Sequence, residues 1–146
     1  MSRVVKRVAL AGLAVALLPA AAAPTGAVDA RFEGLRSPKG ILRICVTTNP
    51  KKFPDCKGDP TAVTRSISAA SPHLEIPGLP AGDYAIAVIH DENGNGKLDT
   101  FAGIPREGVG FSRNPKLAFG PPRFASARFS VSGPAIPQTI RLKYFL

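Results

Sequence analysis

The stretch that decides the fold of this chain reads Asp83-Tyr84-Ala85-Ile86-Ala87-Val88-Ile89-His90. Between its polar ends every residue is aliphatic or aromatic, and successive side chains of an extended strand point to opposite faces. One face would carry Tyr84, Ile86, Val88 and His90, and the other Ala85, Ala87 and Ile89. Because both faces are apolar, the stretch predicts a central strand of a sheet whose back is covered by other structure.

Working outward, other segments of strand length alternate with turn residues. The clearest alternation is near the C-terminal end, where Ile140, Leu142 and Tyr144 fall opposite Arg141 and Lys143. The segments we predict as strands are 30–35, 40–48, 64–69, 73–76, 83–90, 117–120, 125–132 and 137–144. Short strands at this spacing are typical of an antiparallel β-sandwich, here of about seven strands. The stretch 93–115 has no clean period and predicts one long loop.

Composition supports this fold class and excludes several others. The chain has 146 residues, the size of about one domain, with 45% hydrophobic and 20% charged residues. Its 15 Pro and 14 Gly leave little uninterrupted sequence for helices, which excludes an all-helical bundle. With only two Cys and two His, the chain lacks the residues for multi-cysteine zinc sites.

The segment 1–30 has the pattern of a secretory signal peptide. A basic stretch, residues 2–7, precedes an apolar run, residues 8–23. This run contains Pro19 and is shorter than the roughly 20 residues of a membrane-spanning helix. Pro24 disfavours cleavage after residue 23, so we expect cleavage after Ala27 or Ala30, with a single domain over residues 31–146. The mature protein is then periplasmic or extracellular, without a transmembrane anchor.

The two cysteines fit that location. Cys45 falls in a predicted strand, and Cys56 falls in the polar loop that follows it. Disulfides persist in oxidising compartments, so we predict a Cys45–Cys56 disulfide that holds the loop 48–57 across the outside of a sheet. Two unpaired thiols are the alternative.

The chain is basic, with a formal net charge of +9. Arg3, Lys6, Arg7 and Asp29 lie within the segment 1–30, which leaves +7 on the domain. The positive residues are scattered and are not interleaved with stacking aromatic residues, so we expect no nucleic-acid binding. Anionic envelope lipid or polyanionic glycan stays open as a partner.

The end of the central strand carries a candidate metal site. With Asp91 as position 1, oxygen-bearing side chains fall at positions 1, 3, 5 and 9, Gly96 is at position 6, and the carbonyl of Lys97 is at position 7. These ligands are Asp91, Asn93, Asn95, Lys97 and Asp99. Alternating inward side chains and a glycine turn are the features of an EF-hand calcium loop, and hard oxygen ligands suit calcium.

The pattern departs from an EF-hand at position 12, where Ala102 stands in place of a bidentate glutamate. Glu107 is the nearest acidic residue downstream, and we name it as the candidate sixth ligand. A site of this kind is expected to be weak, with a Kd of about 10⁻⁴–10⁻³ M. The alternative is a plain hairpin, because Asn93-Gly94 and Asn95-Gly96 are both strong two-residue turns.

A catalytic interpretation has less support. His90 is followed by Asp91, but no serine lies in a nucleophile elbow of the G-x-S-x-G type. A lone histidine on an apolar strand face is usually structural, and we predict that role for His90. We therefore expect a protein that is not an enzyme, with a small periplasmic hydrolase using the loop near His90 as the alternative.

The residues 78–99, together with the run Gly103-Ile104-Pro105-Arg106-Glu107-Gly108, resemble the bacterial family called domain of unknown function 2141. The resemblance covers almost all of the chain beyond the leader and implies a secreted or periplasmic protein of unassigned activity. A looser resemblance, carried by Leu79-Pro80-Ala81-Gly82, is to transthyretin-like and collagen-adhesin B-type sandwiches. Together they imply a transthyretin-like or immunoglobulin-like sandwich. Our own expectation for its function is a non-enzymatic module whose ion-organised loop faces an unidentified envelope or extracellular protein or glycan.

Overall fold

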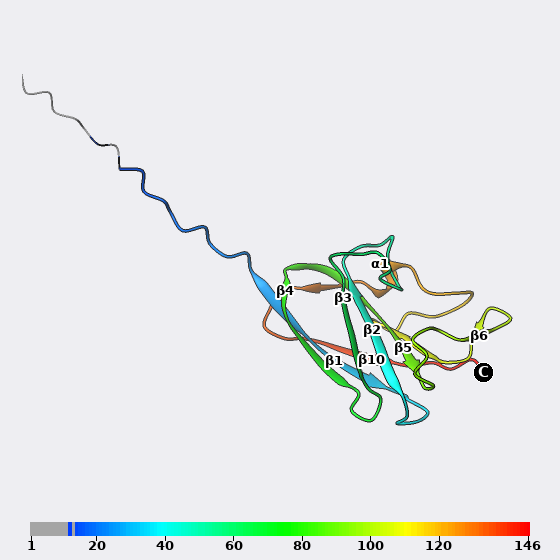
Figure 1. Cartoon of the computed structure of the whole chain (residues 1–146). Helices are drawn as coiled ribbons and strands as arrows, with labels where there is room; N and C mark the ends of the chain where they lie inside the picture. The colour runs from blue at the N-terminus through cyan, green and yellow to red at the C-terminus, as the bar shows by residue number, and fades with distance from the viewer. Residues whose placement is uncertain (1–11, 13) are drawn as a thin grey trace, which may run out of the picture.

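The computed structural model describes residue 12 and residues 14–146. The basic part of the predicted leader and the start of its apolar run lie outside the described residues. Residues 14–24 form no helix or strand and project from the domain (Figure 1). Among the described residues, no helix is long and apolar enough to span a bilayer.

The domain is a β-sandwich, as predicted. One sheet has the order β10-β1-β4, formed by Ile136–Arg141, Thr25–Glu33 and His73–Pro80. The other has the order β3-β2-β5-β8, formed by Val63–Ser68, Ile41–Thr47, Gly82–Asp91 and Gly108–Phe111. β9, Phe129–Val131, pairs with the first part of β5. A short hairpin of β6, Thr100–Phe101, and β7, Ile104–Pro105, lies apart from both sheets (Figure 1).

The main core lies between the two sheets. It combines β1, β4 and β10 side chains such as Val28, Ile76 and Ile140 with β2 and β5 side chains such as Leu42 and Ile86. The predicted inward set of β5 is confirmed, since the other members Tyr84, Val88 and His90 are also buried. Burying each large aliphatic side chain contributes about 1.5–3 kcal/mol, so this core is the main source of stability.

The back of the second sheet is covered, as the two apolar faces of β5 predicted. Cys45 and Cys56 form the predicted disulfide, with Cα atoms 5.8 Å apart. They pack in a second apolar cluster with Ala85, Ala87, Val109, Phe111 and Ala127, and partly buried Phe53 and Phe124 lie against it. The loop that follows β2 is thereby held across the outside of the sheet. The four-residue helix α1, Phe124–Ala127, closes this cluster.

The first strand corrects the predicted domain boundary. β1 begins at Thr25 and not near residue 30, and its Val28 and Ala30 are fully buried. Cleavage after Ala27 or Ala30 would remove the first three or six of the nine residues of a strand that pairs with both β4 and β10. The folded domain therefore starts at about residue 25 instead of residue 31.

Three further expectations about strands were wrong. Segment 117–120 is irregular, and its Phe119 is fully exposed. Segment 125–132 divides into α1 and β9. The loop 93–115 contains β8, whose glycines are required by close packing. A Cβ at Gly108 would overlap the Tyr144 ring, and one at Gly110 would lie 2.8 Å from the Ile140 side chain.

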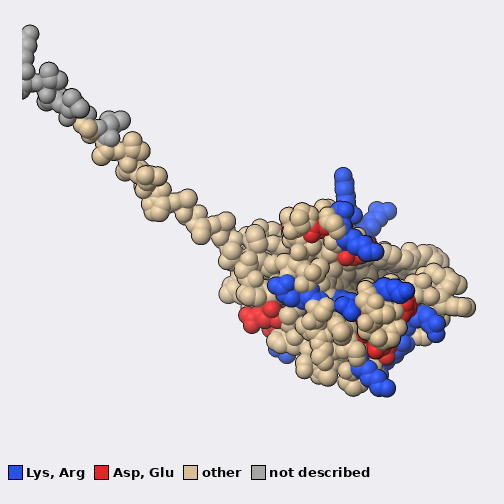
Figure 2. All heavy atoms as spheres, viewed as in Figure 1, with Lys and Arg blue, Asp and Glu red and all other residues tan. Residues whose placement is uncertain are grey.

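The terminal strands differ from a purely antiparallel sandwich. β1 pairs in parallel with β10, from Val28 beside Ile136 to Glu33 beside Arg141. All other strand pairs among the described residues are antiparallel. The face seen in Figure 2 has Lys and Arg side chains spread between Asp and Glu, as the scattered charges of the sequence predicted.

Candidate functional site

The loop that follows β5 is organised by Asp91, the last residue of that strand. Asp91 is fully buried. Its Oδ2 accepts hydrogen bonds from Arg43 Nε at 2.6 Å and from the N–H of Gly96 at 2.9 Å, and its Oδ1 accepts the N–H of Asn95 at 3.1 Å. Burial alone would raise the pKa of Asp91, but the Arg43 guanidinium and the backbone N–H groups hold it below its usual value. Asp91 is therefore an ionised group around which the loop turns.

The next predicted ligands gather on Asp99. The side-chain Nδ2 atoms of Asn93 and Asn95 each lie 2.7 Å from Asp99 Oδ2. The Oδ1 of Asn93 accepts the N–H of Asn95, and the Oδ1 of Asn95 accepts the N–H of Lys97. Gly96 has a positive φ of 82°, the backbone conformation expected of the glycine in this turn. Five of the six predicted ligands thus belong to one hydrogen-bonded loop.

Glu107 reaches the same loop from the start of β8. It is only 5% exposed, and its Oε2 accepts the N–H of Asp99 at 3.2 Å. Its Oε1 is buried and has no hydrogen-bond partner. Among residues 14–146, every other buried side-chain nitrogen or oxygen has one. Burial raises the pKa of Glu107, and the negative charges of Asp91 and Asp99 raise it further. A buried carboxylate oxygen without a partner is costly, so Glu107 needs a cation or a proton.

These groups border an open cleft of about 530 Å³. Its lining residues are Arg36, Glu92, Asn93, Asp99, Thr100, Arg106 and Glu107. Three of the predicted ligands therefore face a common space. Within the described part of the chain, no three His, Cys, Asp or Glu side chains converge closely enough to hold an ion by themselves. Any metal bound here would need the amide and carbonyl oxygens of the loop as well.

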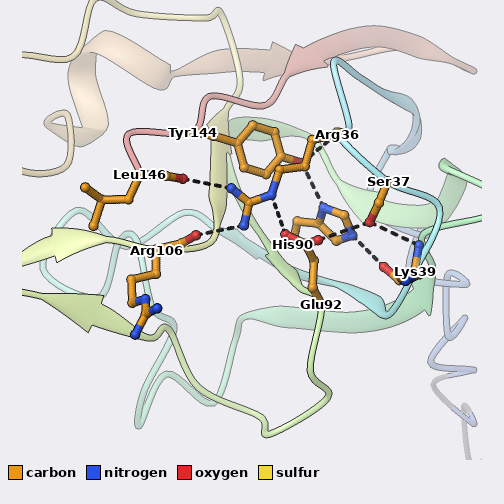
Figure 3. A network of polar contacts seen from close by, with 8 residues as sticks. All are labelled: Arg36, Ser37, Lys39, His90, Glu92, Arg106, Tyr144 and Leu146. Carbon is orange, nitrogen blue, oxygen red and sulfur yellow. Dashed lines mark hydrogen bonds and ion pairs between the residues drawn. The ribbon is translucent and has the colours of Figure 1, made fainter.

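His90 lies beside this loop but faces the interior. It is fully buried, with Nε2 2.6 Å from the carbonyl oxygen of Lys39 and Nδ1 2.8 Å from the hydroxyl of Tyr144 (Figure 3). Since a carbonyl can only accept, Nε2 carries the proton and the Tyr144 hydroxyl donates to Nδ1. Both ring nitrogens are thus engaged away from the cleft. This arrangement agrees with a structural histidine and gives no support to the hydrolase alternative.

Arg36 connects the loop to the end of the chain, a role that sequence reasoning missed. Its Nε donates to Glu92 Oε1 at 2.7 Å, and its two terminal nitrogens donate to the carbonyls of Leu146 at 2.8 Å and Arg106 at 3.0 Å. The guanidinium carbon also lies 4.6 Å from the centre of the Tyr144 ring (Figure 3). These partners are far apart in sequence, so no local pattern could have indicated them.

The comparisons with known proteins agree with the resemblance that the motif carries. No curated protein and no solved structure matches the chain. Residues 31–139 match a family described as "Uncharacterized protein conserved in bacteria (DUF2141)". That match covers most of the chain, including β2 to β5, the loop 91–107 and β8. The chain therefore belongs to the bacterial family of domain of unknown function 2141.

Proposed function

We propose that this domain is a non-enzymatic binding module of the periplasm or the extracellular space, in which one calcium ion organises the loop 91–107. The observation that carries the proposal is the unpartnered Oε1 of Glu107, buried beside the loop that supplies the other oxygen ligands. The ligand set is Asp91, Asn93, Asn95, the Lys97 carbonyl, Asp99 and Glu107. Glu107 takes the role of the closing glutamate of an EF-hand loop, because position 12 of this loop is Ala102.

Electrostatics supports an ion at this place. Burial raises the pKa of Glu107, and the negative charges of Asp91 and Asp99 raise it further. Arg43 neutralises Asp91, but it bonds only to the Oδ2 atom of that carboxylate. No ion pair to Asp99 or Glu107 occurs among the described residues. A divalent cation would convert the repulsion among the carboxylates into attraction.

The amides of Asn93 and Asn95 are compatible with this change. Their Nδ2 atoms now donate to Asp99 Oδ2, where they act as the electropositive partners of that carboxylate. Rotation of each amide would present its Oδ1 in place of Nδ2, at the loss of the hydrogen bond that this Oδ1 accepts from the N–H of Asn95 or Lys97. Calcium accepts such mixed sets of oxygen ligands, whereas magnesium requires tighter octahedral geometry.

The disulfide supports export, because Cys45–Cys56 is buried and would be maintained in an oxidising compartment. An envelope or extracellular protein or glycan is the partner class that we infer for a binding module there. Burial of His90 away from the cleft supports a binding role over a catalytic one.

Isothermal titration calorimetry on the chelator-treated domain tests the proposal. We expect one calcium ion to bind with a Kd of about 10⁻⁴–10⁻³ M, and magnesium to bind more weakly. Asp99→Asn should weaken calcium binding strongly, because Asp99 is the acceptor on which Asn93 and Asn95 converge. Asp55→Asn, at an exposed carboxylate outside the loop, is the matched control. An absence of calcium heat up to about 10 mM, tenfold above the weak end of that range, would leave only the hairpin interpretation.

A further inference from the structure

The short β6–β7 hairpin presents an apolar tip to solvent. Phe101 pairs directly with Ile104, and these side chains are 65% and 43% exposed. Figure 1 shows the hairpin protruding from the sandwich, and at that end of the molecule Figure 2 shows no charged residue at the outermost point. Most large apolar side chains of the domain are buried, so a paired, exposed Phe and Ile at a protruding turn call for a partner.

The presence of Ala102 in the turn of this hairpin is a second sign that the tip is kept apolar. Ala102 and Gly103 connect the strands with positive φ angles of 49° and 78°. Both central residues of such a turn favour Gly, Asn or Asp, and alanine is strained there. Asparagine would fit the backbone better than Ala102 but would place a polar amide at the tip. The tip is therefore apolar in spite of the local preference of the turn.

The base of the hairpin is formed by the candidate calcium ligands. Asp99 directly precedes β6, and Glu107 lies two residues after the end of β7. The N–H of Arg106 donates to the Asp99 carbonyl at 2.9 Å, and the N–H of Asp99 donates to Glu107 at 3.2 Å. An ion held by Asp99 and Glu107 would fix the base of the hairpin and cancel the negative charge beneath it.

We propose that the hairpin 100–105 docks on an anionic phospholipid surface when the loop holds calcium; this rests on the proposed function. Aromatic and aliphatic side chains on a narrow projection can enter the interfacial region of a bilayer. Exposed Lys97 and Arg106 flank the hairpin and would meet anionic headgroups once the carboxylates are neutralised. A stable protein interface needs about 800 Å² on each partner with a polar rim, which so short a tip does not provide.

The chain contains no tryptophan, so a single introduced one reports on its own surroundings. Phe101→Trp places the reporter at the tip, and His73→Trp places it at an exposed position of β4 as the control. With calcium and vesicles of phosphatidylcholine mixed with phosphatidylglycerol, we expect a blue shift for Phe101→Trp only. Chelator, or vesicles of phosphatidylcholine alone, should abolish that shift.

Co-sedimentation with the same vesicles measures affinity. Phe101→Ser should weaken binding by about tenfold or more, the loss expected when one phenylalanine no longer enters an apolar medium. Ala102→Asn should also weaken vesicle binding, although it suits the turn and should preserve or raise the melting temperature. Opposite effects on binding and stability would separate a docking role of the tip from a folding role.

Several outcomes would overturn the inference. The inference fails if vesicle binding is equal in calcium and in chelator. It also fails if Phe101→Ser and the parent domain bind vesicles equally. Retention of an envelope protein that depends on Phe101, with no vesicle binding, would assign the tip to a protein partner instead. Calorimetry on the same sample distinguishes the two failures: calcium heat without vesicle binding leaves the proposed function intact, whereas no calcium heat removes both.

Discussion

The carboxylate of Glu107 accepts the backbone N–H of Asp99 through Oε2 at 3.2 Å and leaves its other oxygen buried without a partner. Asp99 and Glu107 lie on either side of the β6–β7 hairpin in the sequence. A carboxylate with only one hydrogen-bonded oxygen therefore joins the base of a hairpin whose tip is apolar and exposed. Hydrogen bonding therefore accounts for the position of Glu107 but not for its charge. Replacement of this residue should report most directly on what the loop binds.

Replacing Glu107 with glutamine should separate charge from shape. Glu107→Gln is expected to raise the melting temperature of the chelated domain by a few degrees, because it removes a buried, poorly partnered charge. The same change should reduce calcium affinity by at least about tenfold, as a charged ligand is lost. Scanning calorimetry and calcium titration measure the two effects. Glu75→Gln, at an exposed glutamate of β4, should change neither.

Calcium binding should depend on pH through the same residue. Burial and the charges of Asp91 and Asp99 raise the pKa of Glu107 above its ordinary value of 4.5. Between 4.5 and the raised value, the folded chain keeps a proton that the unfolded chain releases. The Glu107 contribution to folding stability is therefore present at low pH and lost as the pH rises through that window.

Because calcium requires the ionised carboxylate, its affinity should fall as the pH falls through this window, and binding should release a proton. Titrations in buffers of different ionisation enthalpy measure that release. Equal heats in all buffers just above pH 4.5, with undiminished affinity, would contradict the assignment of Glu107 as a ligand. Asp91, whose pKa is lowered, contributes folding stability that is fully present above its ordinary pKa of 3.8 and is lost only as the pH falls below that value.

His90 should affect stability more than ion binding. Tyr144→Phe removes the hydroxyl that donates to His90 Nδ1, and the resulting unsatisfied buried nitrogen should cost about 1–3 kcal/mol of folding stability. His90→Gln should likewise lower stability, and both variants should keep their calcium affinity. Tyr84→Phe, which loses only a bond to the Pro80 carbonyl, is the matched control in denaturant unfolding. A loss of calcium binding at unchanged stability would contradict a structural histidine.

The disulfide should contribute measurably to stability. Its two cysteines have a sequence separation of 11, and the chain-entropy estimate for a loop of that size is about 2–3 kcal/mol. A Cys45→Ala/Cys56→Ala variant should therefore unfold at lower denaturant concentration. The backbone amides around the second apolar cluster should be the first to lose protection from hydrogen exchange. Reduction of the parent domain should reproduce the effect, and intact mass before and after reduction reports the bond. Equal midpoints for the parent and the double variant would show that the cluster holds the loop without it.

We predict that the proposed leader is removed before Thr25. Because Val28 and Ala30 are buried in the main core, we now expect the leader to be removed within residues 20–24. N-terminal sequencing of the exported protein measures the site directly. A mature N-terminus at Val28 or Arg31 would contradict this expectation, since β1 would then lose the residues that pair with the second half of β4.

Local patterns in the sequence predict much of the fold. The alternation in β5 and the turn residues around it indicate the central strand, its buried faces and the loop that follows. They place β1 too late, because small residues such as Ala27 and Ala30 serve equally as cleavage sites and as closely packed strand residues. They do not reveal β8, because Gly108 and Gly110 look like turn residues. The reason for these glycines is contact with the Tyr144 ring and the Ile140 side chain, which come much later in the chain.

The residues of the candidate site also fall into two groups, those that the sequence reveals and those that it does not. Asp91, Asn93, Asn95 and Asp99 can be found because their spacing within one loop is itself the signal. Arg43 and Arg36 cannot, because each reaches the loop from a different part of the chain. The parallel pairing of β1 with β10 is also hidden, since alternation identifies a strand but not its neighbour.

That parallel pairing has a consequence for the order in which the chain can fold. β1, the first strand of the domain, lies between β4 and β10, so one of its two neighbours is the last strand of the domain to be synthesised. Contacts of such long sequence separation are slow to form. Until β10 arrives, β1 has one open edge, able to pair with a strand of another chain. A polypeptide threaded across a membrane from its N-terminus would thus complete this sheet only after β10 had crossed.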